Sequence, residues 1–151
     1  MCEKESYTIV PIGSVITSGG NRQRILISSE FAPALKGLSS FSHCQILWWL
    51  HEFAEDHFRQ TTQIDPPYDA PITGVFATRS PVRPNPLGLS VAAILSVDGD
   101  TGIIEVAGLD AYSGTSILDI KAYFPSTDRV KDVRVPSWSA NWGDWWLPDP
   151  S

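Results

Sequence analysis

The feature that most constrains this fold is a proline-rich stretch between two strand-like runs, Gly74 to Ser90 (GVFATRSPVRPNPLGLS). Its first residues, Val75 to Thr78, are apolar or favour β-structure, and a second strand-like run follows from Leu89 to Val97. The three prolines between the runs fix their own φ angles and push each preceding residue towards extended geometry. The sequence therefore predicts a stiff, extended loop that presents Arg79 and Arg83.

A stiff loop of this kind suits a binding site because it loses little conformational entropy when a ligand binds. Arg79 can hold a carboxylate through two parallel hydrogen bonds. The alternative is a rigid surface crossover whose arginines contact only solvent or a nearby carboxylate. The residues of the loop alone leave both interpretations open.

Short β-favouring runs recur along the chain, and turn residues separate them. The expected strands are Tyr7–Thr17, Gln23–Ile27, His43–Phe53, Leu89–Val97, Gly102–Ala107 and Ser116–Tyr123. Pro11 and Gly13 predict a bulge or an edge position in the first strand, and Asp98–Thr101 predicts a hairpin turn. Ser29 can cap a short helix that ends before Gly37. The pattern predicts an all-β barrel or sandwich with one short helix.

The composition indicates one globular domain in a reducing compartment. The chain has 151 residues, 42% hydrophobic and 19% charged, which fits a single domain over 1–151. A net charge of −6 argues against unspecific nucleic-acid binding, although it leaves room for a local basic face. No apolar run is long enough to cross a membrane, and the polar N-terminus lacks the features of a secretory signal. Cys2 and Cys44 make no disulfide framework, and unpaired thiols fit the cytoplasm.

Tryptophans are concentrated near the C-terminus, where the composition changes at about residue 126. The segment from there to residue 151 contains Trp138, Trp142, Trp145 and Trp146 among Pro, Ser and Asp, with no clear period. Exposed tryptophans would favour unwanted association, so we predict an irregular tail that packs on the barrel or on a partner subunit. Trp48 and Trp49, in an apolar run, are assigned to core packing.

The sequence lacks several familiar catalytic and metal-binding motifs. His51 and Glu52 begin like HExxH, but Glu55 stands where the second histidine is required. No complete set of zinc ligands is indicated, and we predict that the protein binds no metal. The sequence also contains no G-x-S-x-G elbow, no G-x-G-x-x-G fingerprint and no P-loop. A nucleotide-type cofactor would therefore have to bind outside the familiar nucleotide-binding folds.

Four segments of the chain resemble one known family. The stretch 74–90 is similar to the signature of the TrmO family, which is also called TsaA-like or YaeB-like. Leu109–Tyr123 (LDAYSGTSILDIKAY) resembles the family's acidic turn, followed by Gly-Thr and Leu-Asp-Ile-Lys. Asn21–Gln23 and His51–Glu52 match two further segments in the family's order, although Asn21 stands where the family usually has proline.

This resemblance implies a β-barrel methyltransferase that uses S-adenosylmethionine. The activity it implies is methylation of the exocyclic amine of threonylcarbamoyladenosine, next to the anticodon of threonine tRNA. It also implies a homodimer, and we expect neither DNA nor a membrane as a partner. The cofactor contacts it implies are Asn21, Arg22, Gln23, His51, Glu52, Arg79, Leu89, Leu109, Asp110, Ala111 and Tyr112.

A chain with a net charge of −6 must gather its few cations on one face to bind tRNA. We expect Arg83, Arg129 and Lys131 to bind the substrate on such a face. Asp119 is expected to fix a turn or to pair with Lys121 or Arg83.

The sequence indicates no catalytic residue, because methyl transfer needs alignment and exclusion of water more than acid–base side chains. Two alternatives to a tRNA methyltransferase stay open. One is methylation of a small molecule or another acceptor, and the other is a non-catalytic module that binds S-adenosylmethionine.

Overall fold

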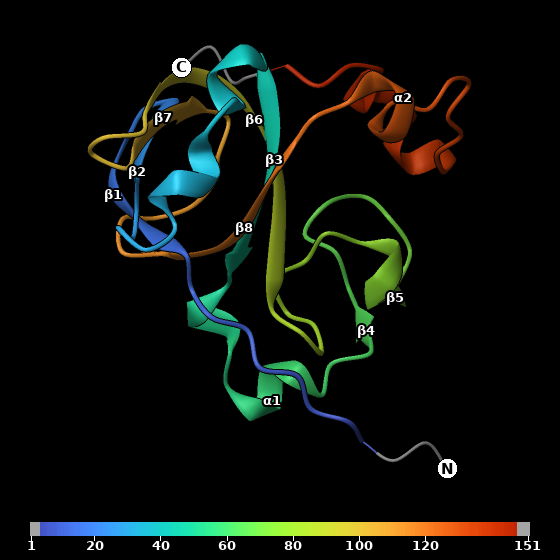
Figure 1. The fold of residues 1–151 in the computed structure, drawn as a ribbon. Helices are drawn as coiled ribbons and strands as arrows, with labels where there is room; N and C mark the ends of the chain where they lie inside the picture. The colour runs from blue at the N-terminus through green and yellow to red at the C-terminus, as the bar shows by residue number, and fades with distance from the viewer. Residues whose placement is uncertain (1–3, 148–151) are drawn as a thin grey trace.

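Six antiparallel strands close into a barrel in the order β1-β2-β7-β6-β3-β8 in the computed structural model, which describes residues 4–147 (Figure 1). The strands are β1 (Gly13–Gly19), β2 (Arg22–Ile27), β3 (His43–Trp49), β6 (Leu87–Asp98), β7 (Ile103–Ala107) and β8 (Ser116–Ala122). The predicted all-β barrel is confirmed. Cys2 and residues 148–151 of the tail lie outside the described range. No helix within that range is long and apolar enough to cross a membrane.

Side chains fill the interior of the barrel. Alternate residues of β2 are buried, as the two-residue period of a strand requires. Ile25, Ile46, Ile104, Val106 and Ile117 are each at most 1% exposed and belong to one apolar cluster. Burial of each such side chain stabilises the fold by about 1.5–3 kcal/mol. Any ligand must therefore bind outside the barrel, on its ends or loops.

The first strand begins later than the sequence predicted. Residues 7–12 form no strand, and β1 starts at Gly13, where an added Cβ would lie 2.2 Å from the carbonyl oxygen of Leu26. Pro11 cannot donate to a ladder, so pairing becomes regular only after it. The predicted bulge is present, but it falls between Val15 and Thr17 in the pairing of β1 with β2.

Two predicted strand segments are 3-10 turns instead. His51–Phe53 forms η3 rather than the end of β3. The Leu50 N–H still donates to the Pro86 carbonyl at 2.8 Å, in register with the pairing of β3 and β6, but Pro86 has no N–H to extend the ladder further. Val75–Ala77 forms η4 after the short strand β5 (Thr73–Gly74). The Thr78 hydroxyl closes this turn by donating to the Val75 carbonyl at 2.7 Å.

The remaining short elements lie outside the barrel wall. The predicted helix is a 3-10 turn, η1 (Ala32–Leu35), with Phe31 rather than Ser29 before it and no side-chain cap. The other elements are η2 (Leu38–Ser40), α1 (Asp56–Arg59), β4 (Gln63–Ile64), α2 (Pro125–Asp128) and η5 (Ser137–Trp142). The short strands β4 and β5 pair only with each other, and with α1 they lie beside the barrel in the lower half of Figure 1.

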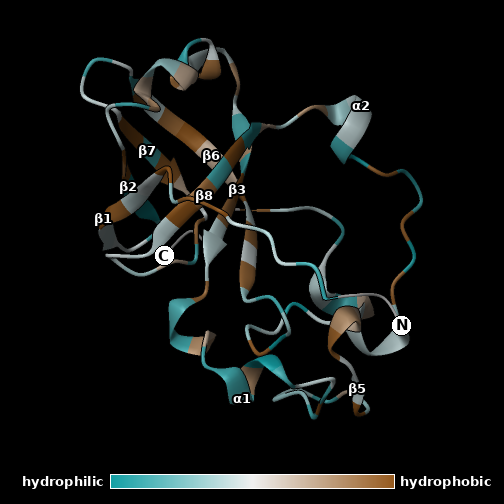
Figure 2. Cartoon of the chain, turned by 60° about the horizontal axis from the view of Figure 1, so that its bottom comes forward, coloured by the Kyte–Doolittle hydropathy of each residue, from teal (hydrophilic) through white to brown (hydrophobic). Residues whose placement is uncertain are grey.

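The C-terminal segment leaves the barrel after β8 and returns to a different part of the molecule. Beyond α2 the chain arcs outward and comes back in η5, beside β5 (Figure 2). Trp138 stacks there on Tyr68, at a centroid distance of 5.6 Å. Trp146 instead packs edge-on against His43 of β3, at 5.2 Å. Trp138 and Trp146 thus contact other parts of the protein, whereas Trp142 and Trp145 stay 63% and 70% exposed.

Candidate functional site

A cavity of about 820 Å³ lies where β3 ends, β6 begins and the loop after β7 comes near. Its walls come from η3, the loop between Thr78 and Pro86, and residues 110–115. Seven residues predicted from the sequence as cofactor or substrate contacts line it: His51, Glu52, Arg79, Arg83, Leu89, Asp110 and Tyr112. Segments that are far apart in the sequence therefore meet around one space.

Two arginines hold the proline loop in place by donating hydrogen bonds to carbonyl groups of the loop. Arg83 is partly buried and donates through Nη1 to the Ser80 carbonyl at 3.1 Å and to the Thr78 carbonyl at 3.4 Å. From α1, Arg59 Nε donates to the Pro84 carbonyl at 2.8 Å. Arg59 was not expected at the site, since nothing in the sequence relates it to a loop that lies 25 residues away. Arg83 therefore braces the loop as well as lining the cavity.

Arg79 follows the η4 turn rather than the end of a strand, and its side chain is exposed. Its guanidinium donates to the carbonyl of Leu89 on β6. A guanidinium has five N–H donors, so this contact fixes the group and leaves donors for a ligand. The arrangement suits the recognition of a carboxylate at the edge of the cavity.

Trp48 offers a flat apolar surface inside the cavity. Its indole lies against the backbone of Gly88, where an added Cβ would be only 2.4 Å from Cε2 of the ring. Nε1 of Trp48 donates to the Ser90 hydroxyl at 3.1 Å, which fixes the ring in its plane. The assignment of Trp48 to core packing was incomplete, because the ring packs against the core cluster and also lines the cavity. The signal in the sequence was Gly88 in an otherwise apolar strand.

Thr115 places an unpaired polar atom at the cavity. The residue is 1% exposed, and its Oγ1 is the one buried side-chain oxygen or nitrogen without a partner among residues 4–147. A buried hydroxyl without a hydrogen bond costs about 1–3 kcal/mol. Thr115 also lines the cavity, so its hydroxyl is a candidate contact for a polar ligand group. In the sequence, Gly114 and Thr115 stand out only as part of the resemblance to a known family.

Five of the predicted cofactor contacts do not line the cavity. Asn21 accepts a hydrogen bond from the Gly108 N–H at 3.1 Å, and buried Gln23 accepts one from the Leu109 N–H at 3.3 Å. These two side chains therefore fix the backbone just before Asp110. They position Asp110 at the cavity without lining the cavity themselves. The other residues that do not line it are Arg22, which is exposed, and Leu109 and Ala111, which belong to the core.

Charges of both signs line the cavity. The side chains of Glu52 and Asp110 are exposed, and neither carboxylate takes part in an ion pair within the described residues. They face the same space as Arg79 and Arg83. Two carboxylates and two guanidinium groups can together hold a ligand that carries an ammonium and a carboxylate.

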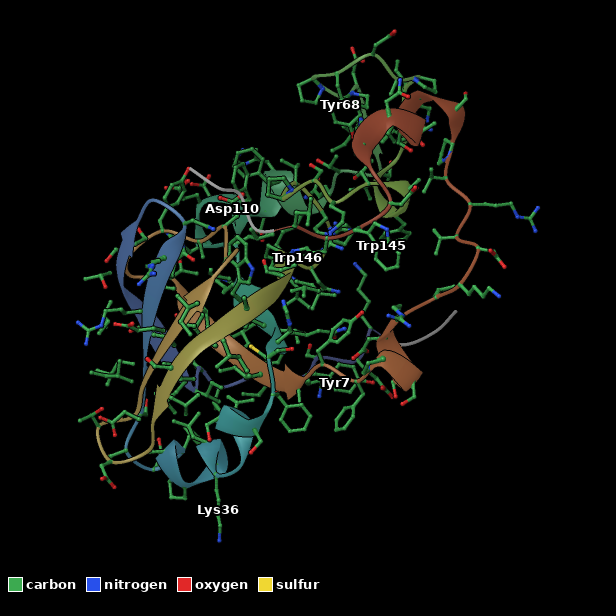
Figure 3. The ribbon with its side chains drawn as sticks, turned by 90° about the horizontal axis from the view of Figure 1, so that it is seen from above. Tyr7, Lys36, Tyr68, Asp110, Trp145 and Trp146 are labelled. Carbon is green, nitrogen blue, oxygen red and sulfur yellow. The ribbon has the colours of Figure 1, made fainter. Side chains whose placement is uncertain are left out.

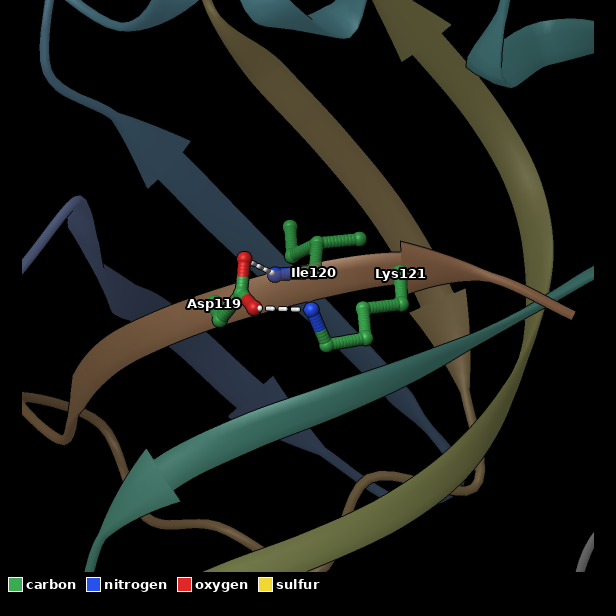
Figure 4. Close-up of polar contacts among 3 residues, drawn as sticks. All are labelled: Asp119, Ile120 and Lys121. Atoms are coloured by element: carbon green, nitrogen blue, oxygen red, sulfur yellow. Dashed lines mark hydrogen bonds and ion pairs between the residues drawn. The ribbon is translucent and has the colours of Figure 1, made fainter.

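Asp119 and the cations of the tail lie apart from this cavity. Asp119 accepts from the Ile120 N–H at 2.9 Å and pairs with Lys121 at 2.8 Å, which confirms the predicted pairing (Figure 4). The hydrogen bond from Lys121 to Asp119 and the negative charge of Asp119 both raise the pKa of Lys121. Arg129 and Lys131 are exposed at and beyond the end of α2, and neither lines the cavity. Over residues 4–147 no group of three His, Cys, Asp or Glu side chains is arranged to hold a metal.

Comparison with known proteins gives consistent matches. A family model described as the tRNA-methyltransferase O N-terminal domain matches residues 5–129. The tRNA (adenine(37)-N6)-methyltransferase of Escherichia coli is 32% identical over 132 residues, which cover 86% of this chain and 56% of that protein. The human protein of the same name is 40% identical over 76% of this chain, but only 25% of the human protein is covered.

Two further matches concern a shorter protein and a solved structure. The S-adenosyl-L-methionine-binding protein of Archaeoglobus fulgidus is 38% identical over 72% of this chain and 74% of its own length. The crystal structure of TrmO from Pseudomonas aeruginosa superposes with a TM-score of 0.69 and 28% identity, covering 87% of this chain and 62% of that one. This chain thus spans 56% of the Escherichia coli protein and only 25% of the human one.

Proposed function

The chain belongs to the tRNA-methyltransferase O family, because the model of the family's N-terminal domain matches residues 5–129, and we propose that the protein binds S-adenosylmethionine and transfers its methyl group. The observation that carries the proposal is the meeting of seven predicted residues around one cavity of about 820 Å³. This volume lies in the range of ligand and cofactor sites in proteins.

Each part of the cofactor has a suitable partner among the residues that line the cavity. Arg79 holds the carboxylate, while Glu52 and Asp110 accept from the ammonium and the ribose hydroxyls. The adenine lies against Trp48, whose ring plane is fixed by Ser90. The Thr115 hydroxyl, which has no hydrogen-bond partner among residues 4–147, bonds to a polar group of the ligand.

The proposed acceptor is the exocyclic amine of threonylcarbamoyladenosine next to the anticodon of tRNA. Support comes from the Escherichia coli and human relatives, both named tRNA (adenine(37)-N6)-methyltransferase. S-adenosylmethionine supplies a methyl group that is already activated by its sulfonium. The protein's own part is therefore to align this group with the amine and to exclude water, so no acid–base pair is required.

One observation favours a second candidate, a non-catalytic module that binds S-adenosylmethionine. The Archaeoglobus fulgidus relative is named only as a binding protein, and this chain covers 74% of its length. A third candidate, methylation of a small molecule, would use the same cofactor contacts.

A homodimer is also part of the proposal, and light scattering of the purified protein tests it.

Two measurements separate these candidates. Calorimetric titration with S-adenosylhomocysteine, in the presence and absence of EDTA, tests the cofactor site and its independence of metal. Transfer of labelled methyl groups to total cellular tRNA tests the acceptor. Absence of binding in the first measurement overturns the whole proposal. Binding without transfer to tRNA favours one of the two other candidates.

A further inference from the structure

A second cavity, of about 700 Å³, adjoins the candidate cofactor site. The two cavities share Thr78, Arg79 and Pro81 in their walls. We call the second cavity the aromatic groove, because its other walls carry four aromatic rings. These rings belong to Tyr68, Phe76, Trp138 and Trp142.

Three of the four rings of the aromatic groove hold one another in place. Tyr68 stacks on Trp138 with an interplanar angle of 24°, and Trp142 meets these two rings edge-on, at 5.0 Å from Tyr68 and 5.4 Å from Trp138. Figure 3 shows Tyr68 beside the turn η5 that carries both tryptophans. Phe76 and Trp142 are nevertheless 83% and 63% exposed. Preset ring faces open to solvent are typical of a binding site rather than of a core.

The chain that leads into the groove is basic. Residues 129–135 (RVKDVRV) connect α2 to the segment that begins η5, and they contain three cations and one acid, a net charge of +2. Arg129, Lys131 and Arg134 are all exposed. The whole chain has a net charge of −6, so this segment is a local excess of positive charge. It favours a partner that carries negative charge close to flat rings of its own.

Single-stranded RNA has this combination of flat bases and phosphates. We propose that the aromatic groove binds an unstacked nucleobase of the RNA substrate, next to the nucleotide that receives the methyl group. The phosphates of the same strand lie along residues 129–134. The groove thereby anchors the strand while the shared wall at Arg79 keeps the neighbouring nucleotide beside the cofactor cavity.

This inference rests on the proposed function, because it assumes an RNA acceptor, but it adds a site that family membership does not supply. The family model ends at residue 129, whereas Trp138 and Trp142 lie beyond that position. Half of the four rings of the groove thus come from a segment outside the matched domain.

The test measures binding of a fluorescein-labelled, adenine-containing seven-nucleotide RNA by anisotropy, at low salt. Trp142→Ala should weaken binding about 5- to 150-fold, the range expected for the loss of one base–aromatic stack. Trp142→Phe, which keeps a flat ring, should restore most of the affinity. The matched control is Trp145→Ala, since Trp145 is 70% exposed on the same segment but does not line the groove.

Titration of each variant with S-adenosylhomocysteine separates this inference from the proposed function. Unchanged cofactor affinity in Trp142→Ala, together with weaker RNA binding, supports the groove. Equal RNA affinity in Trp142→Ala and Trp145→Ala, with normal cofactor binding, overturns the groove while the cofactor site stands. A wild-type protein that binds the cofactor but not the RNA overturns it as well. So does a change from dimer to monomer in Trp142→Ala, because the rings then form a subunit interface.

Discussion

Gly88 provides the space that the indole of Trp48 occupies, and a methyl group at that position would lie 2.4 Å from Cε2 of the ring. The contact is possible only because β3 and β6 pair directly, with Trp48 opposite Gly88 in the register. A glycine in a strand is usually a weakness. Here it allows an aromatic face to lie flat at the wall of the candidate cofactor site.

Gly88→Ala should therefore displace Trp48 and weaken binding of S-adenosylhomocysteine by at least about tenfold. Overpacking of this kind also lowers the free energy of unfolding by about 1–3 kcal/mol. Calorimetry and thermal unfolding measure the two effects. Gly99→Ala is the matched control, because an added Cβ there has no neighbour within 4 Å in the described part of the chain. Normal cofactor affinity in Gly88→Ala would show that Trp48 plays no part in binding.

Arg79→Ala should affect mainly cofactor affinity, whereas Arg83→Ala should also affect thermal stability. Loss of a charged hydrogen-bond partner at the cavity edge should reduce cofactor affinity about tenfold in Arg79→Ala, with little change in Tm. Arg83→Ala removes donors to two carbonyls of its own loop, so a lower Tm should accompany any loss of affinity. Equal effects of the two variants on affinity and Tm would refute this division of roles.

Thr115→Val should have opposite effects on stability and on binding. Replacing the hydroxyl by a methyl group of similar size removes a buried polar atom without a partner, so the free protein should gain up to about 1 kcal/mol. The cofactor loses a hydrogen bond, so its affinity should fall, while Thr115→Ser should retain it. Chemical denaturation and calorimetry test the pair of effects, and a loss of stability in Thr115→Val would contradict the unpaired state of the hydroxyl.

Cys44 predicts a dependence of stability on pH in the alkaline range. Burial raises the pKa of its thiol from the ordinary value of 9.0 to about 11. Between these values the unfolded chain releases the proton while the folded chain keeps it, so the free energy of unfolding falls as pH rises. The loss should total about 2–3 kcal/mol by pH 11, and below pH 9 the contribution is constant. Urea denaturation of wild type and Cys44→Ala across this range should show the steeper fall only in wild type.

Charge reversal on the segment after α2 should affect RNA and not the cofactor. Arg129→Glu with Lys131→Glu should reduce methylation of tRNA and lower the salt dependence of its binding by about 0.7 in log–log slope per lost phosphate contact. Affinity for S-adenosylhomocysteine should stay the same, because neither residue lines the cofactor cavity. Lys36→Glu is the control, since Lys36 is exposed and lies far from Tyr68 in Figure 3. Methylation that resists these reversals would place the RNA elsewhere.

The strands were predictable because alternation and turn chemistry are local properties. The turn at Asp98–Thr101 joins β6 and β7 as expected, and the Asp98 carboxylate accepts from the N–H groups of Asp100 and Thr101. The turns at His51–Phe53 and Val75–Ala77 were missed, because the residue at which the chain enters each turn bonds to a distant segment. Leu50 bonds to Pro86, and Val75 bonds to Thr62, at distances in sequence that no local pattern reports.

The sequence predicted which residues belong to the site better than it predicted how they are arranged. Resemblance selected Arg79, Glu52 and Asp110, which do meet in one cavity. It gave no means to distinguish a residue that lines the cavity from one that holds the backbone behind it, as Gln23 does. Burial of Thr115 and the position of Trp48 depend on how three strands and a loop pack together, so they become visible only in three dimensions.

The closed barrel separates the residues that stabilise the fold from most of those that line the two cavities. Every barrel strand already has a neighbour on both sides, and the apolar side chains that stabilise the fold lie within that ring. The two cavities are built mainly from loops and short turns outside it. Substitutions and insertions in these loops leave the ladder of hydrogen bonds intact. The residues that contact a ligand can therefore change without a change in strand pairing, and the same barrel can support different sites.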